Sequence, residues 1–297
     1  MIVLQKQYRI FDAHCDTLSL LADCGGSFEK NSYNIDKRRM LGYKGYTQVF
    51  ACFIDPEHSE DAMKRCNRLM DIFDECDFSG IRAILSIEGA DMIQSLCDLD
   101  YLKSRCVRSI GLTWNHSNML AGGVNDDTKG LSEFGKTVVK RMSELNILLD
   151  VSHLNDRSFY DAVSVTDAPI IATHSDSREL CANKRNITDD MFCIIRDSGG
   201  CVGINLFPEF LTENKRCTAE DAAEHIMHFL ELDGENSVGI GADFDGTDNM
   251  LPEDIHGCED LYKVFEALKR RGVSDEVIEK ISYGNFERVF RYRRRRV

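Results

Sequence analysis

Short apolar runs alternate along the chain with longer segments in which apolar residues recur every three or four positions. The apolar runs cover residues 8–14, 46–54, 81–88, 107–114, 147–153, 169–174, 200–206 and 237–243. Most of them are continuously apolar, which is typical of parallel β-strands that are covered on both faces. The pattern therefore predicts eight parallel strands.

Segments with helical periodicity separate these strands. They cover residues 57–77, 91–104, 131–145, 156–164, 188–198, 218–232 and 257–271, and two further helical segments follow at 274–281 and 284–293. A strand and a helix repeated eight times predict either a closed (β/α)8 barrel or a doubly wound sheet. The chain has 4 prolines and no low-complexity linker, so we expect a single domain spanning residues 1–297.

Residue types that bind metals lie at the end of five apolar runs. They are His14 with Asp16, Glu88, His153, His174 and Asp243. In a closed barrel the C-terminal ends of all strands open on one mouth. A doubly wound sheet would instead concentrate its site at one switch point. Because these residues extend from the first strand to the last, the sequence predicts a (β/α)8 TIM barrel.

The charge of the chain argues against one class of partner. The formal net charge is −14 over 297 residues, and nucleic-acid binding needs clustered Lys and Arg. The exception is segment 291–297, which reads RYRRRRV. We interpret it as a cationic end after a helix, where positive charge suits the helix dipole, rather than as a membrane or nucleic-acid contact.

The cysteines and the N-terminal segment indicate the compartment. None of the 12 cysteines forms a CxxC motif, so nothing supports a zinc-ribbon or thioredoxin interpretation. The first residues, MIVLQKQYRIFDAHCD, contain no long apolar core, so we expect neither a signal peptide nor a transmembrane span. We therefore expect a cytoplasmic protein with mostly free thiols and no membrane partner.

The spacing of His14 and Asp16 is that of a strand. Residues two apart share a face, so both side chains can reach the barrel mouth while Cys15 points away. A neutral imidazole with a carboxylate suits a divalent metal. Glu88 follows the run Ile-Leu-Ser-Ile, where burying a carboxylate is costly unless a metal or a cation partners it. Its two oxygens would let it bridge two metals.

Five of these residues divide into two ligand sets. His14, Asp16 and Glu88 would hold one metal ion, and Glu88, His153 and His174 would hold a second. Two ions about 3.5–4 Å apart can share a hydroxide and polarise a carbonyl group. Nitrogen and oxygen ligands without thiolates favour Zn²⁺, although Mn²⁺ or Fe²⁺ would also fit.

Two carboxylates compete at the end of the last strand. We place Asp243 at the strand end, where it would orient the hydroxide and carry a proton to the leaving nitrogen. We expect Asp245 to lie in the following loop and to make turn hydrogen bonds.

The remaining histidines carry less information. His225 and His228 lack the His-Glu-x-x-His order of a zinc peptidase helix, so we interpret them as part of a plain helix face. We expect His58 at the surface. His116 and His256 follow the fourth and eighth strands at the mouth, where either could contact substrate.

Several segments together match a known family, in its order and over nearly the whole chain. They are FDAHCDTL, SIEGAD, GLTWNHSN, LLDVSHLN, ATHSDSRELCANKRNITDD, CVGINLF, VGIGADFDG and YGNFERVF. The chain thereby resembles the membrane (renal) dipeptidase family of binuclear zinc peptidases, whose barrels are of the metallo-dependent hydrolase type.

The resemblance implies a peptidase that cleaves unblocked dipeptides, often with a D-residue at the C-terminal position. It also implies two divalent metal ions per chain, most often Zn²⁺, and a homodimer. The metal roles would fall on the two ligand sets named above, and the proton-handling role on Asp243.

The resemblance also points to substrate contacts. Arg185 matches the family's arginine for the substrate carboxylate, which a guanidinium fork binds bidentately. Where animal relatives carry a histidine that is thought to stabilise the oxyanion, this chain has Trp114, so Asn115 or His116 would supply that donor. Phe207 replaces a tyrosine of those relatives. We expect these five residues near the substrate, with activity retained and substrate preference left open.

Two alternatives remain at this point. One is another hydrolase on the same barrel, such as an N-acyl-amino-acid deacylase, an imidase or a TatD-like nuclease, of which the nuclease is disfavoured by the negative charge. The other is a catalytically silent relative that binds a metal or a peptide. The complete set of six candidate residues argues against the silent relative.

Overall fold

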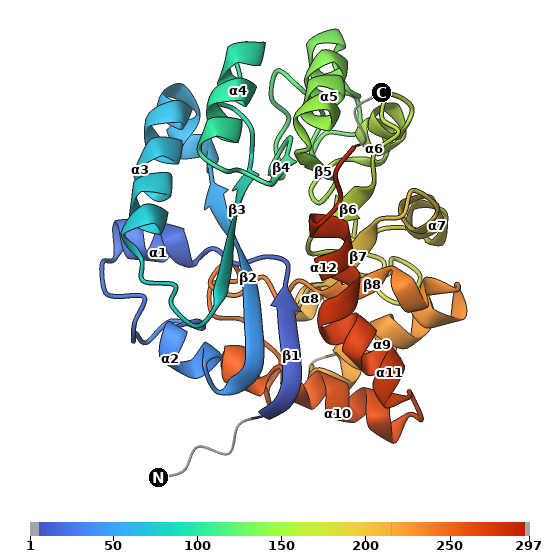
Figure 1. Ribbon diagram of the computed structural model, residues 1–297. Helices are drawn as coiled ribbons and strands as arrows, with labels where there is room; N and C mark the ends of the chain where they lie inside the picture. Colours follow the sequence, from blue (N-terminus) through green and yellow to red (C-terminus); the bar gives the residue numbers. More distant parts are fainter. Residues whose placement is uncertain (1–5, 215, 295–297) are drawn as a thin grey trace.

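A closed barrel of eight parallel strands forms the centre of the computed structural model, which describes residues 6–214 and 216–294 (Figure 1). The strands are β1 (Lys6–Asp12), β2 (Tyr43–Phe53), β3 (Arg82–Glu88), β4 (Ser109–Gly111), β5 (Leu148–Asp150), β6 (Ile170–Ala172), β7 (Cys201–Ile204) and β8 (Val238–Ile240). They follow one another around the barrel in chain order, and Asp12 of β1 pairs with Ile240 of β8 to close it. The predicted (β/α)8 barrel is confirmed.

Helices surround the strands. The α-helices are α1 (Thr17–Asp23), α2 (Lys37–Met40), α3 (Ala62–Glu75), α4 (Leu96–Ser104), α5 (Glu133–Leu145), α6 (Asp156–Val163), α7 (Asp189–Asp197), α8 (Pro208–Leu211), α9 (Ala219–Glu231), α10 (Tyr262–Arg270), α11 (Asp275–Glu279) and α12 (Asn285–Phe290). Shorter helical turns are η1 (Pro56–Asp61), η2 (Gly234–Asn236), η3 (Cys258–Asp260) and η4 (Lys280–Gly284). Each predicted helical segment contains a helix, whereas α1, α2 and α8 were not predicted.

Several strands end earlier than the apolar pattern predicts. β5 stops at Asp150, and β8 stops at Ile240. His153 and Asp243 therefore lie beyond the strands, with φ angles of 68° and 60°. A left-handed backbone at a non-glycine residue interrupts a strand and redirects the chain. These two side chains are thus presented by kinks after the strands and not by the strands themselves.

The interior of the barrel is closed at the end opposite the mouth by α12. Phe11 of β1 stacks on Phe286 of α12 with ring centroids 5.7 Å apart, and Phe290 of the same helix lies 5.3 Å from Phe11. These rings belong to one buried cluster with inward-facing strand residues such as Val49 and Ile84. Figure 1 shows α12 beside β7 and β8. The helix therefore acts as a plug for the barrel.

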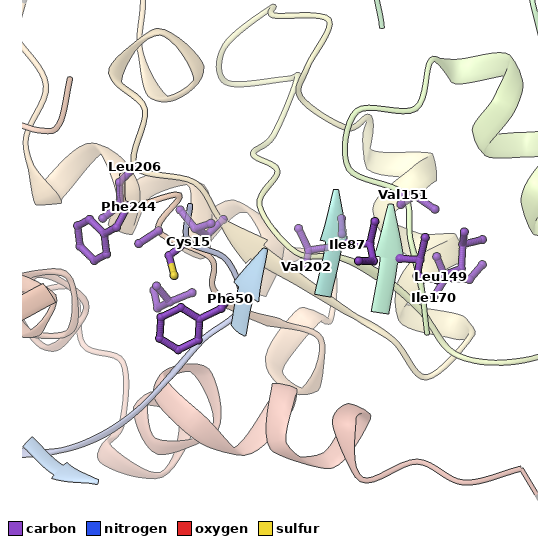
Figure 2. Close-up of a cluster of buried hydrophobic side chains, with 14 of the residues drawn as sticks. Cys15, Phe50, Ile87, Leu149, Val151, Ile170, Val202, Leu206 and Phe244 are labelled. Atoms are coloured by element: carbon purple, nitrogen blue, oxygen red, sulfur yellow. The ribbon is translucent and has the colours of Figure 1, made fainter. Parts of the chain in front are cut away.

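A second apolar layer lies between the barrel and its helices. Figure 2 shows part of it, including Cys15 and Phe50. Cys15 is extended against β2, because its N–H donates to the carbonyl of Val49 and its own carbonyl accepts from Ala51. The predicted alternation of His14, Cys15 and Asp16 is therefore present, with Cys15 outside the barrel.

Within residues 6–214 and 216–294, no helix is both long enough and apolar enough to cross a lipid bilayer. The described part of the basic segment packs on the body of the protein, where Arg291 pairs with Glu287 and Arg294 with Asp167. Arg293 donates to the carbonyl oxygen of Phe290, at the C-terminal end of α12. Residues 295–297 of the segment lie outside the described residues.

Candidate metal centre and active site

Glu88 lies between two groups of imidazole and carboxylate side chains at the barrel mouth. Its Oε2 is 3.2 Å from Nε2 of His14, which is in turn 3.3 Å from Oδ2 of Asp16. Its Oε1 is 2.7 Å from Nε2 of His153 and 3.6 Å from Nε2 of His174. Each oxygen of one carboxylate therefore faces a different group, as the two predicted ligand sets require.

The chemistry of these side chains fits divalent cations. Three groups bring their ligand atoms within 4.8 Å of one another, namely His14–Asp16–Glu88, Glu88–His153–His174 and His14–His174–Asp243. Nε2 of His14 and Oδ1 of Asp16 are buried atoms without a hydrogen-bond partner among the described residues. Buried polar atoms are normally paired, so convergent unpaired ones indicate a site for cations.

The electrostatics of the site also favour cations. Burial alone would lower the pKa of His14, but the carboxylates of Glu88 and Asp16 raise it well above its usual range. Burial raises the pKa of Asp16 to about 6, with the charge of Glu88 acting in the same direction. Buried like charges repel one another unless positive charge offsets them. Divalent metal ions would supply that charge.

A relay from Asp150 orients the ring of His174. The hydroxyl of Thr173 donates to Oδ2 of Asp150 at 2.5 Å and lies 2.8 Å from Nδ1 of His174. Because the O–H of Thr173 donates to Asp150, its oxygen is left to accept a hydrogen bond from Nδ1–H of His174. The lone pair of His174 Nε2 then faces the site. Such outer partners fix the tautomer of metal-binding histidines.

Asn115 plays the corresponding part for His153. Its Oδ1 lies 2.7 Å from Nδ1 of His153, so Nδ1 carries the proton and Nε2 is free to bind a metal. Burial lowers the pKa of His153 to about 4, and the charge of Arg185 acts in the same direction. A neutral ring is the form that binds metals.

Asp243 stands at the edge of the metal-binding group. Its Oδ1 is 3.8 Å from Nε2 of His14, and its Oδ2 accepts a hydrogen bond from Nδ2 of Asn205 at 2.9 Å. Burial, together with the neighbouring charges of Asp16 and Glu88, raises its pKa to about 7. A carboxyl with this pKa exchanges protons readily near neutral pH.

Arg185 is a buried cation without an acidic partner. Its side chain contacts Nδ1 of His153 at 3.1 Å, the hydroxyl of Ser175 at 3.2 Å and the carbonyl of His174 at 3.1 Å. It forms no ion pair within 4.0 Å among the described residues. Since Nδ1 of His153 already donates to Asn115, it is a poor acceptor for Arg185 Nε–H. An anion would offer Arg185 better acceptors than its present ones.

A cavity of about 430 Å³ opens above the metal-binding group. Trp114, Asn115 and Phe207 line it, whereas the side chain of His116 is exposed, with its ring centroid 5.7 Å from that of Trp114. Other lining residues were not singled out by the sequence. They include Phe53, Phe210, Met250, Asp55 and Asp248.

Asp245 and His225, which the sequence analysis placed outside the metal-binding set, make hydrogen bonds that hold loops together. Asp245 accepts hydrogen bonds from the hydroxyl of Thr17 and from the backbone N–H of Asn34, both at 2.6 Å, and so joins the loops after β8 and β1. His225 is buried, accepts from the N–H of Ser177 at 3.0 Å and lies 2.8 Å from the carbonyl of Leu211. His225 therefore connects two loops, and it belongs to none of the metal-binding groups of the described residues.

A comparison with known families assigns the chain. Residues 60–295 match the sequence profile of the family described as Membrane dipeptidase (Peptidase family M19). The chain belongs to this family. An uncharacterized protein of Klebsiella pneumoniae is 32% identical over 247 residues, which cover 79% of this chain and 90% of that protein. An uncharacterized dipeptidase of Schizosaccharomyces pombe is 34% identical over 71% of this chain, which spans 53% of the yeast protein.

Solved structures support the assignment of the chain to the M19 metallo-dipeptidases, and one of them is a dipeptidase described as a metallopeptidase of family M19, with 25% identity and a TM-score of 0.86. A metallopeptidase from Rhodobacter sphaeroides, liganded with a phosphinate mimic of the dipeptide L-Ala-D-Ala, superposes with a TM-score of 0.84. The sequences are 25% identical, and the match covers 96% of this chain and 99% of that one. The fold and family predicted from the sequence are thus confirmed.

Some functional positions were missed by the sequence analysis. Asp150, Thr173 and Asn205 orient the candidate residues through hydrogen bonds. Asp150 had a detectable signal, because it is a carboxylate at the end of an apolar run. Thr173 and Asn205 are ordinary polar residues whose roles depend on contacts between neighbouring strands.

Proposed function

We propose that this member of the M19 family is a metal-dependent dipeptidase that hydrolyses free dipeptides, including those with a D-residue at the C-terminal position. The observation that carries the proposal is the placement of Glu88 between two ligand groups. The dipeptide mimic bound by the Rhodobacter sphaeroides relative supports the substrate class. The volume of the cavity lies in the range of about 300–1,000 Å³ that small-molecule sites occupy.

Two divalent metal ions would occupy the site, and its nitrogen and oxygen ligands favour Zn²⁺. His14 and Asp16 would hold one ion, His153 and His174 the other, and Glu88 both. When bound, these ions would supply Lewis-acid polarisation of the scissile carbonyl and would lower the pKa of the attacking water.

Asp243 would move the proton of the reaction. Its carboxyl lies beside the metal-binding group, and Asn205 holds one of its oxygens by a hydrogen bond of 2.9 Å. The other oxygen is then free to take a proton from the nucleophile and to deliver it to the leaving nitrogen. Burial acts to raise the pKa of Asp243, and acid–base catalysis is most efficient when the pKa of the group lies near the working pH.

Arg185 would restrict the enzyme to peptides with a free C-terminal carboxylate. A buried guanidinium without an acidic partner gains most from an incoming anion. Trp114, Asn115 and Phe207 would contact the remainder of the substrate. Because Oδ1 of Asn115 accepts from His153, the Nδ2–H group of Asn115 is the part of that side chain that would donate to the oxyanion, whereas His116 is exposed.

A panel of L,L- and L,D-dipeptides tests the proposal, with Zn²⁺ supplied and a chelator as control. Release of free amino acids that stops with chelator and returns with Zn²⁺ is the expected result. Metal analysis of the same preparation should give two ions per chain. A protein that holds two metals but cleaves no dipeptide would refute the proposal and point to another amide hydrolase, such as an N-acyl-amino-acid deacylase.

A further inference from the structure

Two pairs of aromatic side chains face each other across the cavity. Phe207 and Phe210 follow β7, whereas Phe53 ends β2 and Trp114 follows β4. The strands run in chain order around the closed barrel, so β7 lies opposite β3, between β2 and β4. The rings of Phe53 and Trp114 are in edge contact at 5.4 Å, and those of Phe207 and Phe210 at 4.8 Å. The cavity thus has two separate aromatic walls.

The wall formed by Phe207 and Phe210 adjoins Arg185. The guanidinium carbon of Arg185 is 5.8 Å from the centroid of the Phe210 ring. The backbone of this wall is held on both sides, because the N–H of Phe207 donates to Oδ1 of Asn205 at 2.7 Å and the carbonyl of Phe210 accepts from Nδ2 of Asn186 at 2.8 Å. Both side chains are half-buried. They form a preorganised apolar surface next to the unpaired cation.

Charge is distributed unevenly around the same mouth. Carboxylates line the cavity from the loops after β8, β1 and β2 and from the end of β3. They are Asp243, Asp245, Asp248, Asp16, Asp55 and Glu88. Arg185 lies after β6, which is opposite β2 in the closed barrel. With Asp16 and Glu88 assigned to the metal ions, Asp55 and Asp248 remain to attract an ammonium group. A zwitterionic dipeptide therefore fits in one direction, with its carboxylate at Arg185 and its ammonium group toward these two aspartates.

We propose that Phe207 and Phe210 bind the side chain of the C-terminal residue of the dipeptide and select neutral, apolar side chains at that position. The inference rests on the proposed function, because the orientation of the substrate follows from Arg185 binding its carboxylate. The residue that carries the carboxylate must then place its side chain beside the aromatic wall nearest to Arg185. An acidic side chain there would lose hydration against two rings.

The test compares kcat/KM for Ala-Ala, Ala-Leu, Ala-Phe and Ala-Asp with that for Leu-Ala and Phe-Ala. One methylene group in an apolar pocket changes the ratio of kcat/KM between two substrates by about 10- to 200-fold. We therefore expect Ala-Leu and Ala-Phe to exceed Ala-Ala by about tenfold or more, and Ala-Asp to fall below Ala-Ala. In Phe210→Ala, the ratio of Ala-Phe to Ala-Ala should fall by about tenfold, while the ratio of Phe-Ala to Ala-Ala changes less than twofold.

Two further variants separate an effect on substrate preference from a general effect on folding. Phe210→Leu retains an apolar side chain and should preserve the preference for Ala-Leu. Phe53→Ala removes a ring from the opposite wall and should leave the ratio of Ala-Phe to Ala-Ala unchanged. If the wild-type protein cleaves Ala-Ala without any preference at the C-terminal position, or if Phe210→Ala and Phe53→Ala change that ratio equally, the inference is overturned. Failure to cleave any dipeptide would overturn the proposed function itself.

Discussion

Gly246 lies where the structure leaves no room for a side chain beside the metal-binding group. A Cβ atom added at this position would be 2.6 Å from Oδ1 of Asp243 and closer still to Oδ2 of Asp16. The shortest common contacts between carbon and oxygen are about 3.3 Å. In Gly246→Ala, Asp243 would therefore have to retreat by about 0.7 Å, the difference between about 3.3 Å and 2.6 Å, and Asp16 by more.

Displacements of this size are large for such a site. Metal–ligand distances vary by only about 0.2 Å around their preferred values, and a misplacement of about 1 Å can reduce the rate about 100-fold. We expect Gly246→Ala to bind the metal next to Asp16 more weakly and to lose turnover by about two orders of magnitude. Metal analysis after dialysis and steady-state rates at saturating Zn²⁺ measure the two effects separately.

Gly284→Ala is the matched control. A Cβ atom at Gly284 would meet nothing closer than the carbonyl oxygen of Glu279 at 3.6 Å, which is ordinary contact, and the residue lies far from the mouth. This variant should retain both metals and full turnover. If Gly246→Ala also retains both within twofold, the close approach of this loop to Asp16 and Asp243 does not govern the geometry of the site, and our reasoning is refuted.

Asp243→Asn should keep its metals but lose turnover by about 100-fold or more, as removal of a general acid–base group does. Metal analysis and steady-state rates measure the two effects, and a variant that keeps both its metals and wild-type turnover would show that Asp243 does not move the proton. Arg185→Met should raise KM for free dipeptides by about 10- to 100-fold, from the loss of hydrogen bonds to a charged group, and much less for C-terminally amidated ones; an equal effect on both would contradict carboxylate binding. His116→Ala tests whether this exposed residue donates to the oxyanion. A large fall in kcat would support that role, and an unchanged kcat would dismiss it. Phe286→Ala should lower the free energy of unfolding by about 3–5 kcal/mol in a urea titration, because its ring is 1% exposed within the barrel plug; a loss below about 1 kcal/mol would show that α12 is not needed to seal the interior.

The apolar runs predicted the barrel because buried parallel strands leave little choice of side chain. The metal-binding residue types were visible for a similar reason, since His174 and Glu88 interrupt apolar runs where they are costly to bury. The ends of the strands were less predictable. His153 and Asp243 adopt left-handed backbone conformations, and these conformations are set by contacts with other loops, which the local sequence does not encode.

The substrate side of the site was predicted only in part. Trp114, Asn115 and Phe207 were expected near the substrate and line the cavity, whereas Phe210 is one of 16 phenylalanines and was not singled out. It lies in the short helix α8, which begins at Pro208, and its ring lines the cavity next to that of Phe207. Asp150 and Thr173 are 23 residues apart and meet only through the pairing of β5 with β6.

The plug formed by α12 has a consequence for how the protein is made. Phe286 and Phe290 seal an interior whose first ring, Phe11, belongs to β1 and is therefore synthesised before the other seven strands. As the chain leaves the ribosome, the inner faces of the strands thus stay exposed to water until residues 285–290 emerge, well after β8 is complete. Exposed apolar surface of this kind promotes aggregation. We therefore expect the nascent chain to be prone to aggregation until α12 has emerged.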